Sequence, residues 1–118
     1  MTTMNSYAGV VQQGKKRGTV LGYPTLNIPL NEEGVSGIYA AKVTVGSAEY
    51  PAAAFANPKR KLLEAHLLDF SGDLYGKEIT IELCEKIRES KAFPDDVSLR
   101  AAIAEDIAAV RAYFMKQV

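Results

Sequence analysis

The residues best placed to do chemistry lie in the stretch RGTVLGYPTLNIPL, which covers residues 17–30. Pro24 has a fixed φ angle, so Thr25 follows it with a preset direction. If the segment is extended, side chains two residues apart point the same way, and the Thr25 hydroxyl and Asn27 amide oxygen converge. Two neutral oxygens are poor zinc ligands, but they suit Mg²⁺, which keeps waters and substrate phosphates. The alternative is the start of a strand flanked by prolines, where both side chains only cap the backbone.

A glycine-bearing, basic loop precedes this pair and is a candidate for phosphate binding. Glycines permit positive φ angles and let backbone N–H groups approach an anion, and the loop also carries positive side chains. The candidate residues are Gly14, Lys15, Arg17, Gly18 and Gly22. The segment GVVQQGKK has the spacing of a P-loop, but it carries Lys16 where Ser or Thr should hold magnesium. We therefore exclude a P-loop, while a solvated loop remains the alternative for this run and for residues 59–61.

A carboxylate and the only histidine form a second candidate cluster, in the segment EAHLLDFSGDLYGK. On a strand, Glu64, His66 and Leu68 share one face, so the carboxylate lies on a mainly apolar element. Such a setting raises the pKa of a carboxylate and lets it accept a proton from a hydroxyl. The alternatives are a structural His66 and a solvent-facing Glu64.

The elements that must position these residues are strands followed by one helix. Alternating apolar residues predict strands at YAGVVQQ, GIYAAKVTV, AEYPAAAF, LLEAHLLDF and EITIELCEKI, with Pro51 marking an edge or a bulge. The helix has its apolar residues at Leu99, Ile103, Ile107, Val110 and Phe114, and either Asp96 or Ser98 can cap it. Consecutive strands and a single helix predict an antiparallel barrel or curled sheet with a packed C-terminal helix.

Composition limits the class of protein. A chain of 118 residues with 47% hydrophobic and 24% charged residues predicts one globular domain over residues 1–118, with a frayed start at 1–6. The net charge of 0 argues against a nucleic-acid or membrane-surface binder. Cys84 is the only cysteine, which favours a reducing, cytoplasmic setting. No signal peptide or eighteen-residue apolar stretch is seen, so we expect neither secretion nor a membrane span.

Taken together, these segments resemble the riboflavin kinase family, including the C-terminal kinase module of bacterial bifunctional riboflavin kinase/FAD synthetases. The resemblance runs from Tyr7 onward through five ordered matches, which are much more specific together than any one alone. They are GKKRGTVLGYPTLNI, GVSGIYAAKV, EAHLLDFSGDLYGKEITI, KIRESKAFPD and LRAAIAEDI.

The resemblance implies a six-stranded antiparallel Greek-key barrel with a C-terminal helix, which phosphorylates riboflavin to FMN with ATP and magnesium. Thr25 and Asn27 would bind magnesium and phosphate, and residues 14–22 would cover the nucleotide phosphates. Glu64 would take the proton from the ribityl 5′-hydroxyl, and Arg88 would lie in a segment that closes over the flavin. We also expect a monomer that acts on small molecules.

Two departures from the family pattern keep a second hypothesis open. Leu26 stands where the family has a small alanine, which predicts crowding beside the metal residues. In AAFANPKRKLLE the family's glycine is missing and the loop before Glu64 is several residues short. The alternative is a catalytically weakened module that binds flavin or nucleotide. A barrel that binds single-stranded nucleic acid is disfavoured by the zero net charge and the absence of tryptophan. No nucleotidylyltransferase segment is seen, so we do not expect FAD synthesis.

Overall fold

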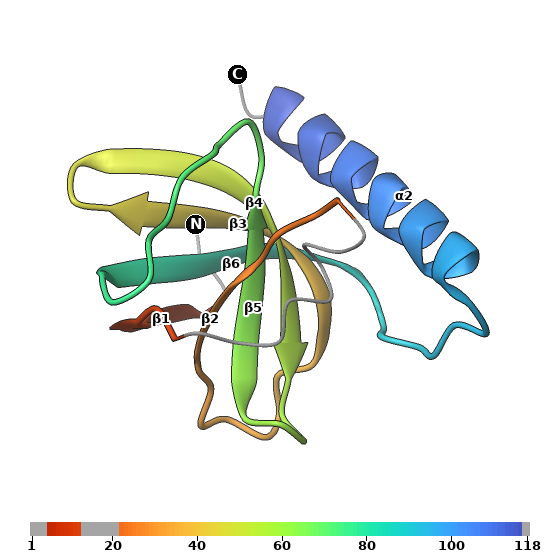
Figure 1. Cartoon of the computed structure of the whole chain (residues 1–118), viewed down its shortest axis with the longest axis horizontal. Helices are drawn as coiled ribbons and strands as arrows, with labels where there is room; N and C mark the ends of the chain where they lie inside the picture. Colours follow the sequence, from red (N-terminus) through yellow and green to blue (C-terminus); the bar gives the residue numbers. More distant parts are fainter. Residues whose placement is uncertain (1–4, 13–21, 117–118) are drawn as a thin grey trace.

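A computed structural model of the chain describes residues 5–12 and 22–116. Its elements, in chain order, are β1 (Ser6–Val10), β2 (Leu26–Pro29), β3 (Gly37–Val45), β4 (Ala48–Asn57), β5 (Leu62–Leu67), β6 (Glu78–Arg88) and α2 (Asp96–Met115). The strands form one antiparallel sheet that curls into a nearly closed barrel, and α2 lies along one side of it (Figure 1). The predicted barrel with a C-terminal helix is therefore confirmed.

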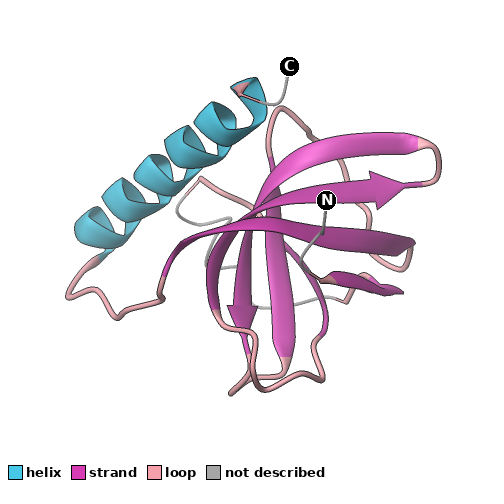
Figure 2. Ribbon diagram, turned by 180° about the vertical axis from the view of Figure 1, so that it is seen from behind, coloured by secondary structure: helices cyan, strands magenta, loops and turns pink. Residues whose placement is uncertain are grey.

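The order of the strands around the barrel is β1-β6-β3-β4-β5-β2. Three consecutive strands, β3 to β5, are followed by β6, which returns to lie beside β3. The spatial order β6-β3-β4-β5 is that of a Greek key. The ends of the sheet approach each other where Gln12 forms an isolated bridge with Asn27 of β2. Figure 2 shows the same barrel from behind.

Alternation along the strands separates a barrel interior from an outer face. In β5, Leu63, Ala65 and Leu67 point into the main core, whereas Leu62, Glu64 and His66 lie on the opposite face. In β4 the inward positions are all alanine, at Ala52, Ala54 and Ala56. The outer face of β3, β4 and β6 packs against α2, and the outer face of β2, β4 and β5 is left for the site.

The apolar stripe of α2 has two different uses. Its C-terminal part covers the outer face of the barrel, where Val110 is fully buried with Ala40 and Leu68. Its N-terminal part, Leu99 and Ile103, instead lines a pocket. One helix thus closes part of the core and forms a wall of the site.

Three local expectations need correction. The helix cap is Asp95, whose Oδ1 accepts a hydrogen bond of 2.8 Å from the Ser98 N–H, so neither Asp96 nor Ser98 is the cap. Asp95 directly precedes the first helical residue, and only from that position does a side chain reach this orphan donor. The frayed start at 1–6 does not hold for Ser6, which begins β1 and pairs with Glu82.

The third correction concerns Leu68, which does not share a strand face with Glu64. β5 ends at Leu67, and Asp69 has a φ of 57°, so the chain turns away there. Pro51 follows the expectation of a local edge, because β4 pairs with β5 only from Ala52 onward. Within the described residues no helix combines the length and apolar character needed to cross a membrane.

Candidate active site

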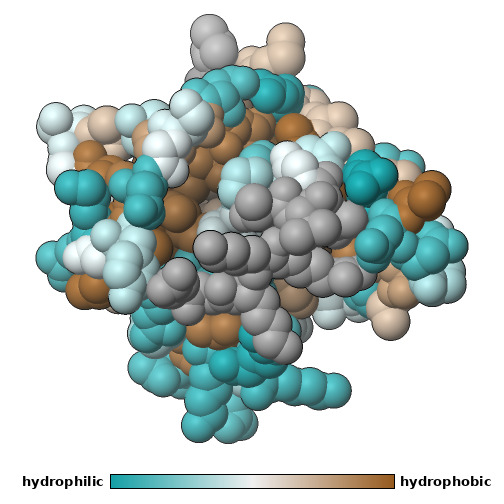
Figure 3. Space-filling view, viewed as in Figure 1, coloured by the Kyte–Doolittle hydropathy of each residue, from teal (hydrophilic) through white to brown (hydrophobic). Residues whose placement is uncertain are grey.

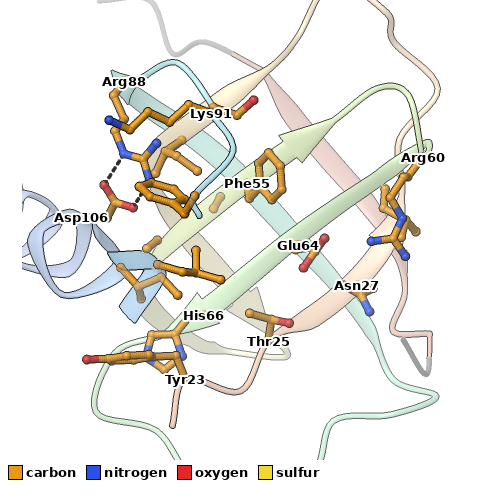
Figure 4. A pocket seen from close by; sticks show the side chains of 18 residues that line it. Tyr23, Thr25, Asn27, Phe55, Arg60, Glu64, His66, Arg88, Lys91 and Asp106 are labelled. Atoms are coloured by element: carbon orange, nitrogen blue, oxygen red, sulfur yellow. Dashed lines mark hydrogen bonds and ion pairs between the residues drawn. The ribbon is translucent and has the colours of Figure 1, made fainter. Parts of the chain in front are cut away.

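A pocket of about 400 Å³ lies between the outer face of the barrel and α2 (Figure 4). On the face shown in Figure 3, hydrophobic residues gather mainly in the interior of the view, and hydrophilic residues lie along most of its outline. The lining of the pocket comes from the segment before β2, from β2 to β5 with the β4–β5 connection, from the end of β6 and the segment after it, and from α2. The lining residues are Tyr23, Thr25, Asn27, Ile38, Ala53, Ala54, Phe55, Arg60, Leu62, Glu64, His66, Arg88, Ser90, Lys91, Phe93, Leu99, Ile103 and Asp106. The pocket thus collects side chains from both halves of the chain.

Asn27 and Glu64 are direct partners across the β2–β5 strand pair. Asn27 is only 4% exposed, and its Oδ1 is buried without a hydrogen-bond partner in the part of the chain that the structure describes. An unpaired buried carbonyl oxygen costs free energy unless a ligand or ion satisfies it. The site therefore presents a desolvated oxygen next to a carboxylate.

Burial raises the pKa of Glu64 above its usual 4.5, and the positive charge of Arg60 partly opposes this shift. Desolvation disfavours the charged form of a carboxylate, so its affinity for a proton increases. This is the environment predicted from the apolar strand. A carboxylate of this kind is a good candidate for a general base.

Thr25 lines the same pocket as Asn27, two residues away along the chain, as predicted for an extended segment. His66 holds the segment before it in place. Its Nδ1–H donates to the Pro24 carbonyl at 2.7 Å, and the Tyr23 ring meets the imidazole edge-on at 5.6 Å. These contacts support a structural role for His66, which fixes the direction of the Pro24–Thr25 backbone.

Arg88 is at the opposite side of the pocket from Arg60 (Figure 4). Its Nε and one terminal nitrogen donate to both carboxylate oxygens of Asp106 at 2.8 Å, and the other terminal nitrogen donates to the Glu89 carbonyl. Asp106 is 6% exposed, and the Phe93 ring lies 5.6 Å from the guanidinium. Arg88 therefore joins the end of β6 to α2.

Several lining residues were not identified from the sequence. Asp106 follows Ile103 by three residues and precedes Val110 by four, so its carboxylate interrupts the apolar face of the helix. That interruption is a signal that could have been used. Arg60 was visible only as one member of a basic run, Phe93 only as part of the matched segment KIRESKAFPD, and Phe55 carried no signal of its own.

Two other expectations concern the glycine-bearing loop and Leu26. Gly14, Lys15, Arg17 and Gly18 lie outside the described residues. Gly22 is described, and its φ of 92° shows the positive value that was expected of this loop. Leu26 packs against the barrel core, on the strand face opposite that of Thr25 and Asn27, so the predicted crowding of that pair is wrong.

The barrel, the helix and the pocket with its partly desolvated carboxylate define a candidate small-molecule site. Residues 2–114 match the family model Flavokinase, described as riboflavin kinase. The chain belongs to this family, as the resemblance indicated.

Individual relatives agree with this assignment. The chain is 36% identical over 115 residues to a bifunctional riboflavin kinase/FMN adenylyltransferase of Haemophilus influenzae, in an alignment that covers 90% of this chain and 37% of that protein. The chain thus spans a little over a third of the length of such relatives.

Two solved structures are similar in fold. One is described as a macrolide-efflux protein from Streptococcus pneumoniae, with a TM-score of 0.78 and 25% identity over 90% of this chain and 38% of that one. The other is riboflavin kinase from Trypanosoma brucei, with a TM-score of 0.70 and 22% identity over 98% of this chain and 83% of that one. The second likeness concerns the fold alone.

Proposed function

We propose that this chain transfers the γ-phosphoryl group of ATP to the 5′-hydroxyl of riboflavin and so forms FMN and ADP. The observation that carries the proposal is the Asn27–Glu64 pair, a desolvated oxygen beside a carboxylate of raised pKa in one pocket. Family membership and the names of the relatives supply the substrate class.

Glu64 is the proposed general base. Its carboxylate accepts the proton of the riboflavin 5′-hydroxyl while the oxygen of that hydroxyl bonds to the γ-phosphorus. The bond from the γ-phosphorus to the bridging oxygen breaks, and ADP leaves with that electron pair. Positioned general-base help is worth roughly 10²–10⁴-fold in rate.

Thr25 and Asn27 are the proposed holders of magnesium. The buried, unpartnered Oδ1 of Asn27 fits this role, because Mg²⁺ takes hard oxygen ligands and retains others from water and phosphate. When bound, the ion would neutralise charge on the phosphates. The glycine-bearing loop, from Gly14 to Gly22, is proposed to cover the nucleotide.

The flavin ring is proposed to occupy the end of the pocket beside α2. The wall there is largely apolar, with Phe93, Leu99 and Ile103, and Arg88 stands at its edge. A planar ring system suits such a surface, since aromatic side chains offer large contact areas. The charged end of the pocket then receives the ribityl chain and phosphates.

The direct test incubates the purified chain with riboflavin, ATP and magnesium and measures FMN by chromatography. We expect turnover by the wild type and a loss of roughly 10²–10⁴-fold in Glu64→Gln, which keeps the size of the side chain but not its basicity. Flavin and nucleotide affinities should remain within a few-fold. Turnover of Glu64→Gln at the wild-type rate would exclude Glu64 as the base.

A second candidate is a flavin- or nucleotide-binding module without useful turnover. It is favoured by the short β4–β5 connection, which consists only of residues 58–61. Flavin binding without FMN formation by the wild type would establish this alternative. We further propose that residues 1–118 act as one domain, as a cytoplasmic monomer, and size-exclusion chromatography tests the oligomeric state.

A further inference from the structure

The short connection between β4 and β5 carries three consecutive cations, Lys59, Arg60 and Lys61. The hairpin is tight, since Asn57 pairs directly with Leu62. The Asn57 Oδ1 accepts from the Arg60 N–H at 3.3 Å, and the Lys61 N–H donates to the Pro58 carbonyl at 3.2 Å. These two hydrogen bonds give the turn a defined conformation.

Of these three cations only Arg60 lines the pocket. Figure 4 shows it on the side of Asn27 and Glu64, away from Arg88. Its charge acts on the Glu64 carboxylate. Within residues 5–12 and 22–116, however, its guanidinium has neither an ion pair nor a side-chain hydrogen bond. Arg88 differs, because Asp106 already satisfies it.

An arginine at the charged end of a pocket, whose guanidinium has no side-chain partner among the described residues, suits a ligand with several anionic oxygens. The planar guanidinium binds phosphate through two parallel hydrogen bonds, which a lysine cannot do. The Glu64 carboxylate carries charge of the same sign as the incoming phosphates, and a cation beside it offsets the resulting repulsion. The oxygens of Thr25 and Asn27 are neutral themselves, and Arg60 would act in addition to the magnesium that they are proposed to hold.

We propose that Arg60 binds a phosphate group of the phosphoryl donor, and that the short β4–β5 turn positions Arg60 for this contact. The inference rests on the proposed function and adds a specificity residue for the donor. It also assigns a role to the short β4–β5 connection, which the sequence alone indicated only as a departure from the family pattern. Lys59 and Lys61 are surface charges of the same turn.

The test compares Arg60→Ala and Arg60→Lys with Lys59→Ala as the matched control on the same turn. We expect the KM for ATP to rise about 10-fold or more in Arg60→Ala, which is the effect of losing a charge-assisted hydrogen bond. The KM for ATP of Arg60→Lys should lie between those of the wild type and Arg60→Ala, because lysine keeps the charge but cannot form two parallel hydrogen bonds. The KM for riboflavin should stay within about twofold in all three, and so should every constant of Lys59→Ala.

A binding measurement separates this inference from the proposed function. Calorimetry with inorganic pyrophosphate and magnesium should show binding to the wild type that is about 10-fold weaker in Arg60→Ala. If the wild type makes no FMN, the proposed function is overturned. The comparison of pyrophosphate affinities would still test whether Arg60 binds phosphate. Equal affinities of wild type and Arg60→Ala, equal losses for ATP and riboflavin, or a wild type that binds no pyrophosphate would overturn the inference.

Discussion

The carboxylate of Glu64 lies in an environment that disfavours its charged form. Its carboxylate is partly desolvated and has no ion pair in the described part of the chain, although Arg60 is near enough to act on it. Burial of a charge lowers stability, and residues kept at such a cost are often those that function needs. The free energy of unfolding should therefore respond to the ionisation of this one side chain.

We expect Glu64→Gln to be more stable than the wild type at neutral pH. The folded-state pKa of Glu64 is raised, so its contribution to stability is fully present below the usual value of 4.5 and is lost as pH rises through the folded pKa. Thermal unfolding of both proteins across pH should show a difference near zero in acid that grows toward neutrality. A difference that does not change with pH would contradict the desolvation argument.

Asn27 contributes an amide oxygen whose hydrogen-bonding capacity is unused in the described chain. Asn27→Ala should lower turnover by roughly 10²-fold, because one oxygen that neutralises charge at the phosphates is lost. Melting temperature should change little, since no hydrogen bond to Oδ1 is broken. Thr25→Ala should behave similarly, with Thr25→Ser as the control that keeps the hydroxyl. Near-normal turnover with unchanged magnesium dependence would exclude the metal assignment.

Among the elements, β6 and α2 are joined by the Arg88–Asp106 ion pair at one wall of the pocket. Asp106 is buried, so removal of Arg88 leaves a carboxylate without its partner, which is a costly change. We expect Arg88→Met to lower the free energy of unfolding by about 2 kcal/mol, and Arg88→Met/Asp106→Leu to recover part of that loss. Chemical denaturation of Arg88→Met, Asp106→Leu and the double variant measures the coupling.

The same pair bears on the proposed flavin end. Arg88→Ala should weaken riboflavin binding more than ATP binding, because the guanidinium positions the segment after β6 against the apolar wall. Calorimetry with each ligand checks this, and Arg111→Ala is a control that removes an exposed ion pair to Asp69. Equal losses for both ligands would assign Arg88 to the fold alone.

At the scale of the whole molecule, closure of the barrel depends on a close approach between β1 and β2. A Cβ added at Gly9 would lie 3.1 Å from the Ile28 Cβ and 3.4 Å from the Pro29 Cδ. Ile28 is fully buried, so it cannot move freely. We expect Gly9→Ala to cost about 1 kcal/mol of stability, measured by denaturation. Gly34→Ala is the control, since its Cβ would meet nothing within 4 Å, and equal effects would show that the approach is not limiting.

The sequence predicted the elements well where one periodicity ran unbroken. The segment GIYAAKVTV matches β3 residue for residue, because the alternating pattern runs through the whole segment and a turn follows its last residue. The Glu64–His66 face was also predictable, but Leu68 was not, since a left-handed residue at Asp69 ends the strand. The pairing of Asn27 with Glu64 joins residues far apart in the chain, and no local pattern encodes it. Arg60 shows the same limit, because only the folded hairpin distinguishes it from its neighbours.

The apolar stripe of α2 is divided between the barrel core and the pocket, so we expect a ligand in the pocket to increase the order of the helix. In the free protein, Val110 is anchored by the barrel, whereas Leu99 and Ile103 remain only partly buried. A ring system that fills the pocket would remove apolar surface of both from water, so binding should carry a negative heat-capacity change. The first turns of α2 should also exchange their amide hydrogens more slowly once ligand is bound. We therefore expect bound substrate to stabilise the first turns of α2, which the barrel alone leaves partly exposed.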